Sequence, residues 1–210
     1  MRINFFWLFL PQAVLAILYF FLLHRAFVRL RLSPKTALFF LFIILGTTFL
    51  PDFPLGRGLA LNIGGMGLPL GIALYLIVTS DREAEKKRAL LTAGAVAVAV
   101  WLLNRLLPPD PGYLGFDLDP LFMPSLAAAA LAYLLGRSRR AAFSGAVLGV
   151  FFLETASWME NLLKGFPQAT VILGGGGVFG PAVVSGALAL FLAEAAGEIR
   201  ERLERGGKRV

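Results

Sequence analysis

The stretch LNIGGMGLPLGIALYL, residues 61–76, is apolar enough for a lipid bilayer, yet its first half is rich in residues that weaken helices. After the polar Asn62, five such residues fall within eight positions: Gly64, Gly65, Gly67, Pro69 and Gly71. An interior glycine costs a helix about 1 kcal/mol relative to alanine, and a proline about 3 kcal/mol. We therefore expect a membrane helix whose first half is broken and whose second half, from Ile72, is regular.

The composition of the whole chain indicates an integral membrane protein. Of the 210 residues, 58% are hydrophobic and only 16% are charged, whereas soluble domains have about 45–50% apolar and about 25% charged residues. The sequence contains no cysteine and a single histidine, His24. This excludes disulfides, thiolate sites and any relay or metal cluster built from several histidines, so we expect no metal and no cofactor. We interpret residues 1–210 as one membrane domain.

Seven apolar segments are candidates for membrane-spanning helices, which need about 20 mostly apolar residues each. They comprise residues 4–23, 36–50, 60–78, 89–107, 119–135, 141–160 and 170–195. The fold class predicted from them is all-α, a polytopic transmembrane helical bundle whose third and seventh spans are broken by glycine and proline. The first segment is expected to be retained rather than cleaved as a signal peptide, because its apolar core is too long and contains Pro11.

Positive charge is concentrated on alternate connections between these segments. Sixteen of the 20 lysines and arginines follow the first, third, fifth and seventh segments: Arg25, Arg29, Arg31, Lys35, Arg82, Lys86, Lys87, Arg88, Arg137, Arg139, Arg140, Arg200, Arg202, Arg205, Lys208 and Arg209. The positive-inside rule then predicts a plasma-membrane protein with its N-terminus outside and its basic tail, residues 197–210, in the cytoplasm. These basic residues are expected to contact anionic lipid headgroups rather than nucleic acid.

The segment VILGGGGVFGPAVVSGALAL, residues 171–190, repeats the pattern of the third span. Both segments start with aliphatic residues, pass through a glycine cluster, reach a proline (Pro69 or Pro181) and continue as regular helix. The predicted topology runs them in the same direction, which is consistent with a weak internal repeat of three spans, one connecting span and three spans. Paired broken spans of this kind are typical of binding sites near the membrane midplane in transporters.

Two interpretations fit the glycine clusters. Irregular backbone in a bilayer must face protein or a watery cavity, because an unpaired peptide group in hydrocarbon is costly, so the clusters could line a cavity. The alternative is close packing through small residues four apart, a pattern that Gly67 with Gly71 and Gly145 with Gly149 also match. We favour the cavity for residues 174–177, because packing needs one small residue per turn. The GxGxxG string at 175–180 lacks the strand and helix context of a dinucleotide site.

Glu154 is an ionisable residue inside the sixth span, and it shares a helical face with Ser157, Trp158 and Asn161. A rise of about 1.5 Å per residue places it about 20 Å along the span. It is either a protonatable ligand or proton carrier, or a structural carboxyl group that bonds a neighbouring helix or pairs with Arg105. The predicted solute-binding residues are Asn62, Gly64, Gly65, Glu154, Ser157, Gly174, Gly175, Gly176 and Gly177, and the predicted outer vestibule contains Asp117, Asp119 and Arg105.

Three strings together resemble a family of bacterial and archaeal multi-pass membrane proteins that is carried as a domain of unknown function. They are NIGGMGLPLGIALYL at 62–76, SGAVLG at 144–149 with an acidic residue soon after, and GGGGVFGPAVVSGALA at 174–189. The resemblance covers most of the chain from about residue 33 onward. It implies the fold and the membrane placement, but no established activity.

The pattern of that family favours one aspartate late in the sixth span and a second directly after a phenylalanine that follows the last glycine cluster. Such a pair is similar to the layout of intramembrane aspartyl proteases, whose two carboxylates share a proton to activate water. This chain departs at both places, with Glu154 near the first and Gly180 after Phe179 at the second. Because one carboxylate is missing, the resemblance does not extend to a catalytic pair.

The leading hypothesis from the sequence is a seven-span protein that binds or passes a small solute or ion through a cavity between the two broken segments and Glu154. One alternative is a membrane-embedded hydrolase that uses Glu154 with Asp117 or Asp119. Another is a noncatalytic scaffold. The sequence leaves the substrate, the direction of movement and the oligomeric state open, a homo-oligomer included.

Overall fold

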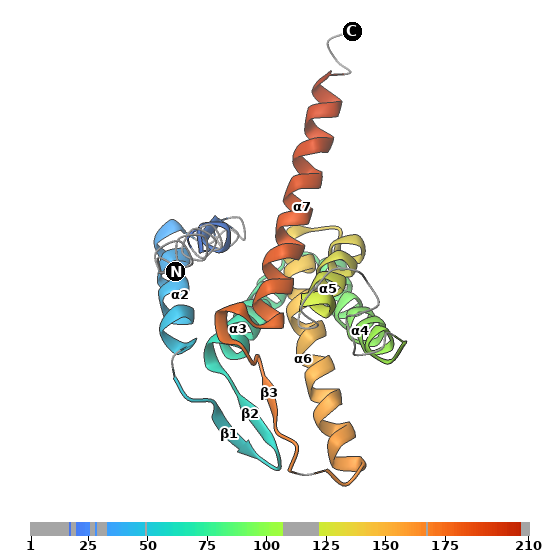
Figure 1. The fold of residues 1–210 in the computed structure, drawn as a ribbon. Helices are drawn as coiled ribbons and strands as arrows, with labels where there is room; N and C mark the ends of the chain where they lie inside the picture. The colour runs from blue at the N-terminus through green and yellow to red at the C-terminus, as the bar shows by residue number, and fades with distance from the viewer. Residues whose placement is uncertain are drawn as a thin grey trace, which may run out of the picture.

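The structure is a computed structural model of the full chain, and it describes residues 17, 20–25, 28, 33–48, 50–106, 122–166 and 168–206. These residues form a mainly helical fold, which confirms the all-α class (Figure 1). The long helices are α2 (Pro34–Thr48), α3 (Leu68–Val78), α4 (Glu83–Leu106), α5 (Phe122–Gly136), α6 (Arg139–Leu163) and α7 (Pro181–Gly206). Two short helical segments, a π-helix at Ile63–Gly67 and a 3-10 helix at Gly177–Phe179, precede α3 and α7.

A small sheet that the sequence analysis did not predict stands beside the C-terminal half of α6 (Figure 1). Its strands are β1 (Phe53–Gly56), β2 (Leu59–Leu61) and β3 (Val171–Leu173), in the order β1-β2-β3. The connection between the predicted spans 36–50 and 60–78 therefore forms a hairpin, turned by Arg57 and Gly58 at φ values of 52° and 73°. Strands β2 and β3 pair in parallel, with Leu59 opposite Val171.

The two glycine-containing segments consequently begin as strands rather than as helices. In the segment predicted as a span over 60–78, the chain passes from β2 through the π-helix into α3. In the segment predicted over 170–195, it passes from β3 through tight turns and the 3-10 helix into α7. The parallel pairing of β2 with β3 places the two segments side by side and in the same direction.

Helix α6 is the centre of the helical part and contacts α3, α4, α5 and α7. Every residue from 141 to 150 is buried. Gly145 and Gly149 face α4 so closely that added Cβ atoms would lie 2.5 Å from Thr92 Cγ2 and 2.6 Å from Val96 Cγ1. The small-residue packing predicted for Gly145 and Gly149 is thus confirmed, whereas Gly71 faces open space.

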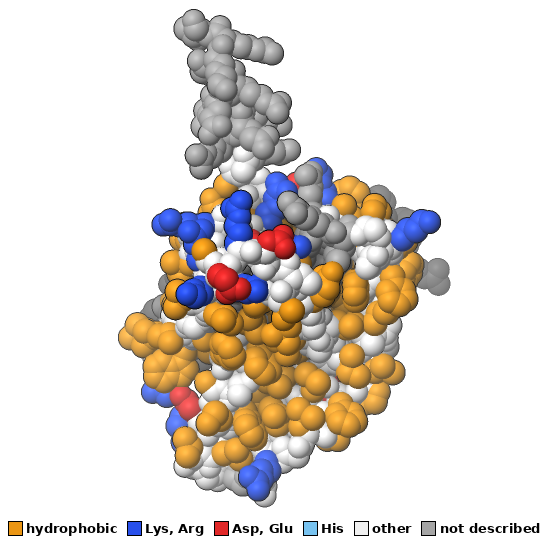
Figure 2. All heavy atoms as spheres, turned by 180° about the vertical axis from the view of Figure 1, so that it is seen from behind, with side chains coloured by type: hydrophobic (Ala, Val, Ile, Leu, Met, Phe, Trp, Pro, Cys, Tyr) orange, Lys and Arg blue, Asp and Glu red, His pale blue; other side chains and the backbone are white. Residues whose placement is uncertain are grey.

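The outer surface of the helices is apolar over a wide area (Figure 2). Helix α4 alone exposes five large aliphatic side chains, those of Leu90, Leu91, Val98, Leu102 and Leu106. Helices α4 and α6 are long and apolar enough to cross a membrane, by length and composition. The apolar parts of the other described helices are shorter, including Pro181–Gly197 of α7.

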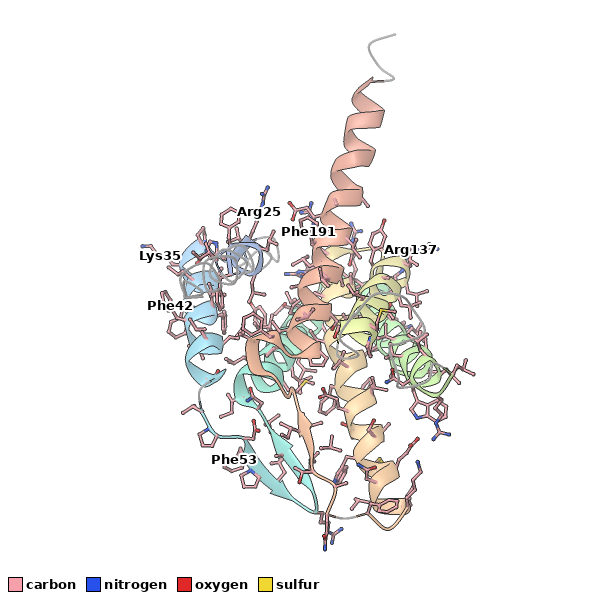
Figure 3. All side chains as sticks on the ribbon, viewed as in Figure 1. Arg25, Lys35, Phe42, Phe53, Arg137 and Phe191 are labelled. Atoms are coloured by element: carbon pink, nitrogen blue, oxygen red, sulfur yellow. The ribbon has the colours of Figure 1, made fainter. Side chains whose placement is uncertain are left out.

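Charged side chains gather at one end of this apolar surface. In Figure 3, Arg25, Lys35 and Arg137 lie at the end of the molecule toward which α7 extends, and Phe53 of β1 lies at the other end. The basic residues that follow α3 and α5 come to the same end, because both helices run toward it (Figure 1). The fold thereby places residues from separate basic connections on one side of the apolar surface.

Candidate functional site

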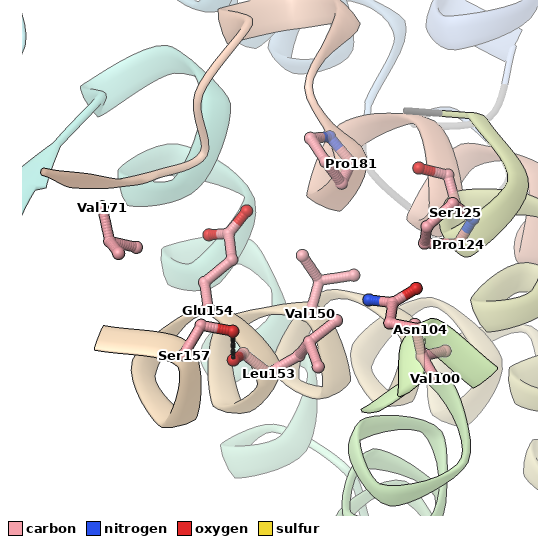
Figure 4. Close-up of a pocket in the computed structure, with 10 residues that line it drawn as sticks. All are labelled: Val100, Asn104, Pro124, Ser125, Val150, Leu153, Glu154, Ser157, Val171 and Pro181. Carbon is pink, nitrogen blue, oxygen red and sulfur yellow. Dashed lines mark hydrogen bonds between the residues drawn. The ribbon is translucent and has the colours of Figure 1, made fainter. Parts of the chain in front are cut away.

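A pocket of about 440 Å³ lies between α4, α5, α6, β3 and the start of α7 (Figure 4). Its described lining residues are Val100, Asn104, Pro124, Ser125, Val150, Leu153, Glu154, Ser157, Val171 and Pro181. The volume falls within the range of about 300–1,000 Å³ that is usual for small-molecule sites, and such sites are mainly apolar with a few polar groups. Two of the predicted solute-binding residues, Glu154 and Ser157, are among the lining residues.

Glu154 of α6 is held in place by a backbone N–H group of the glycine cluster 174–177. The Gly174 N–H donates a hydrogen bond of 2.9 Å to Oε2 of Glu154. The structure shows no hydrogen bond from the described residues to the second carboxylate oxygen, and Figure 4 shows the carboxylate directed into the space between β3 and α7. One oxygen is thus fixed by the fold, and the other is available to a bound molecule.

Ser157 lies one turn beyond Glu154, and its hydroxyl donates a 3.0 Å hydrogen bond to the Leu153 carbonyl within the helix. The neighbouring Trp158 donates from Nε1 to the Arg57 carbonyl at 2.9 Å, which ties the hairpin turn to α6. The polar face predicted for the sixth span therefore has two parts, one in the pocket and one against the sheet.

Gly174 can reach Glu154 because its backbone takes a conformation that suits glycine. Its φ is +73°, in the left-handed region that other residues rarely adopt. A Cβ atom at Gly174 would overlap the backbone of Gly65 and Met66, and one at Gly65 would overlap the carbonyl of Gly174. The two glycine clusters therefore contact each other directly, without room for a solute between Gly65 and Gly174.

Asn62 supports this contact from the start of the π-helix. Its Oδ1 accepts a 2.8 Å hydrogen bond from the Gly65 N–H, and its Nδ2 donates at 2.8 Å to Oδ1 of Asp52. The side chain is buried, with 6% of its surface exposed, so each polar atom needs such a partner. Asn62 acts as the N-cap of the π-helix, and its side chain connects this helix to Asp52, directly before β1.

Only some of the predicted site residues lie at the pocket. Glu154 and Ser157 line the pocket, and Gly174 contacts it through Glu154. Asn62, Gly64, Gly65 and Gly175–Gly177 are not among its described lining residues. Arg105 forms an ion pair of 2.9 Å with Glu160 rather than with Glu154, and its guanidinium lies over the Trp101 ring. Asp117 and Asp119 lie outside the described residues.

Asn104, Ser125 and Val171 complete the pocket, and the sequence analysis did not assign them to a binding site. Ser125 is 98% buried in α5, directly after Pro124. A buried hydroxyl in an otherwise apolar helix is a recognisable signal, but nothing in the sequence says which neighbour it faces. Val171 lines the pocket because β3 is a strand there.

Gly180 leaves no space for a second carboxylate at its position. A Cβ atom there would lie 2.6 Å from the carbonyl oxygen of Gly175 and 2.9 Å from that of Gly177. Any side chain at Gly180 would therefore require the preceding turns to move. Among the described lining residues, Glu154 is the sole acid.

A protein family described as "Protein of unknown function (DUF1614)" matches residues 26–192. The chain belongs to this family. All the described lining residues of the pocket fall within the part that matches the DUF1614 family. Searches of curated proteins and of solved structures find no match.

Proposed function

We propose that this DUF1614 protein is a multi-pass protein of the plasma membrane that binds a small solute in the pocket around Glu154. The membrane placement is supported by two helices of sufficient length, α4 and α6, and by the wide apolar surface. The proposed orientation, with the C-terminus in the cytoplasm, is supported by the basic residues that follow α3 and α5 at one end. The seven spans and the weak internal repeat belong to the same proposal.

Single cysteines provide a direct test of this orientation, because the natural chain has none. A cysteine in place of Lys164, after α6, is expected to react with a membrane-impermeant maleimide in intact cells. A cysteine in place of Arg139, at the start of α6, is expected to react only after the membrane is permeabilised. Equal labelling of both positions in intact cells would contradict the topology, and the cysteine-free chain is the control.

The binding function is supported chiefly by the environment of Glu154. A carboxylate that is held by one backbone N–H, and that directs its second oxygen into a 440 Å³ pocket, combines a fixed polar contact with apolar walls. Pockets of this kind orient a ligand through few polar groups and gain affinity from burial of its apolar part. The hydrolase alternative depends on Asp117 or Asp119, which lie outside the described residues, and Glu154 is the sole acid of the described lining.

Filling the pocket should abolish binding without disturbing the helices. Val171→Phe places an aromatic side chain at the pocket wall, and a strand accepts phenylalanine readily. Leu102→Phe, on the exposed side of α4, is the matched control. The full chain in lipid nanodiscs is dialysed against a mixture of small cationic, neutral and anionic organic solutes, and bound solutes are identified by mass spectrometry. We expect the wild type and Leu102→Phe to retain a solute that Val171→Phe releases.

Equal retention of every solute by the wild type and Val171→Phe would contradict the proposal. Correct folding of each variant is checked by its thermal unfolding temperature, which should be close to that of the wild type.

A further inference from the structure

One residue sets the charge of the described pocket lining. Of its ten described lining residues, Glu154 is the sole residue with an ionisable side chain, and six others are Val, Leu or Pro. The remaining polar groups, Asn104, Ser125 and Ser157, are neutral. Among these described residues, a solute therefore meets apolar walls and a single acidic group.

Glu154 has no basic partner in the part of the chain that the structure describes. The ion pairs found there join Lys86 to Glu83, and Arg105 and Lys164 to Glu160. The one hydrogen bond to the Glu154 carboxylate comes from a neutral peptide group, the N–H of Gly174. A partly buried carboxylate is stabilised most by a cation that hydrogen-bonds to it, and the described residues do not supply one here.

From this arrangement we infer that the solute bound beside Glu154 is a protonated amine carried on a small apolar body. This inference rests on the proposed binding function and names its substrate class. Alkylamines carry a positive charge near neutral pH, as the lysine side chain does. The ammonium group would bond the free oxygen of Glu154, while the apolar body would contact Val100, Val150 and Leu153.

Charge also predicts which solutes the pocket rejects. An anionic solute would face the Glu154 carboxylate, and the described lining residues include no cation to offset the repulsion. A neutral alcohol of the same shape could form a hydrogen bond, but it would gain no charge pairing. Hydrogen bonds to charged groups contribute more than neutral ones, so the amine is expected to bind about ten times more tightly than the alcohol.

Three probes of matched shape test the inference: 2-phenylethylamine, 2-phenylethanol and 3-phenylpropionate. Their binding to the full chain in nanodiscs is measured by isothermal titration calorimetry at neutral pH. The expected order of affinity is amine, then alcohol, with no binding of the carboxylate. Glu154→Gln is expected to lower the affinity for the amine about tenfold or more, and to change the affinity for the alcohol by less than about twofold. The glutamine keeps an oxygen that can accept from the Gly174 N–H, so the local fold should persist.

Thr155→Val is the matched control on α6, because the Thr155 hydroxyl donates a 2.7 Å hydrogen bond to the Phe151 carbonyl within the helix and Thr155 is not among the described lining residues. We expect it to leave the affinity for the amine within about twofold. Equal affinity for the amine and the alcohol in the wild type would overturn the amine inference while leaving solute binding intact. Unchanged amine binding in Glu154→Gln, or no binding of the amine to the wild type, would overturn it as well. Loss of all solute binding in the dialysis experiment would instead remove the proposed function itself.

Discussion

Replacing Gly174 with alanine is expected to lower the free energy of unfolding by about 3–5 kcal/mol. Two costs combine at this position. The residue has a φ of +73°, and a Cβ atom would overlap the backbone of Gly65 and Met66. A backbone obstacle cannot be avoided by a change of rotamer, so β3 and the π-helix would have to separate. The measurement is equilibrium unfolding in mixed detergent micelles, followed by tryptophan fluorescence.

Gly71→Ala is the control for this experiment. Gly71 lies in α3, and the structure places no described atom within 4 Å of its Cβ direction. Alanine should be neutral or stabilising there by up to about 1 kcal/mol, because it favours helix more than glycine does. An unfolding curve for Gly174→Ala that overlays the wild type would show that the two segments are not in the contact described.

The Gly174→Ala variant should also weaken the hydrogen bond that positions the Glu154 carboxylate, because the donor of this bond is the N–H of residue 174. One substitution is therefore expected to lower both the stability of the protein and the affinity of the pocket. Glu154→Gln in the binding experiment distinguishes them, since it removes the charge and leaves the glycine contact unchanged.

The double substitution Gly145→Ala and Gly149→Ala is expected to destabilise the protein by about 4 kcal/mol. Each new Cβ would approach a β-branched side chain of α4, Thr92 or Val96, within 2.6 Å. Side chains of this type have few alternative rotamers in a helix. Helix α4 would have to move away from α6, and the two helices would lose contacts along their shared face. Thermal unfolding of the protein in nanodiscs measures the loss.

Relief of the crowding should restore part of the stability. Val96→Ala removes Cγ1, the atom nearest to a Cβ at residue 149, so the pair Val96→Ala with Gly149→Ala should be more stable than the sum of the single effects by about 1–2 kcal/mol. Gly94→Ala, on α4 with open space beside it, is the control and should have little effect. Strict additivity between positions 96 and 149 would contradict the packing of these two helices.

The helical part of the fold could be predicted because the helices coincide with continuous apolar segments of the sequence. Uninterrupted apolar residues from Ala89 mark α4, and the apolar run from Ala141 marks α6. The match of Gly145 with Gly149 predicted close packing, since residues four apart share a face. The partner of that face, α4, could not be read from the sequence, because nothing local records which helix lies opposite.

The sheet could not be predicted for a related reason. Strands β2 and β3 contain three residues each, too few to show an alternating pattern, and both merge into apolar segments that read as helix. Their pairing depends on a partner more than a hundred residues away in the sequence. Gly65 and Gly174 are also more than a hundred residues apart in the sequence. The sequence therefore indicated two irregular segments, but it did not indicate that these segments contact each other.

The candidate site was predicted in part. Glu154 and Ser157 were recognisable because polar residues inside an apolar helix are costly and tend to serve a purpose. The expected partner Arg105 pairs with Glu160 instead, and Glu154 is held by a backbone N–H. A peptide group has no signature in the sequence, so this contact becomes visible only in three dimensions.

The parallel pairing of Leu59 with Val171 also sets the order in which the protein can be assembled. During synthesis β2 emerges early, but its partner strand emerges only after α3, α4, α5 and α6 have been made. Contacts between residues so far apart in the chain form late, because the loop between them must close first. The wall at Val171 and the Gly174 N–H that holds Glu154 are therefore completed by the last part of the chain. A nascent or truncated chain that ends before β3 contains the helix that carries Glu154 but lacks the complete pocket beside it.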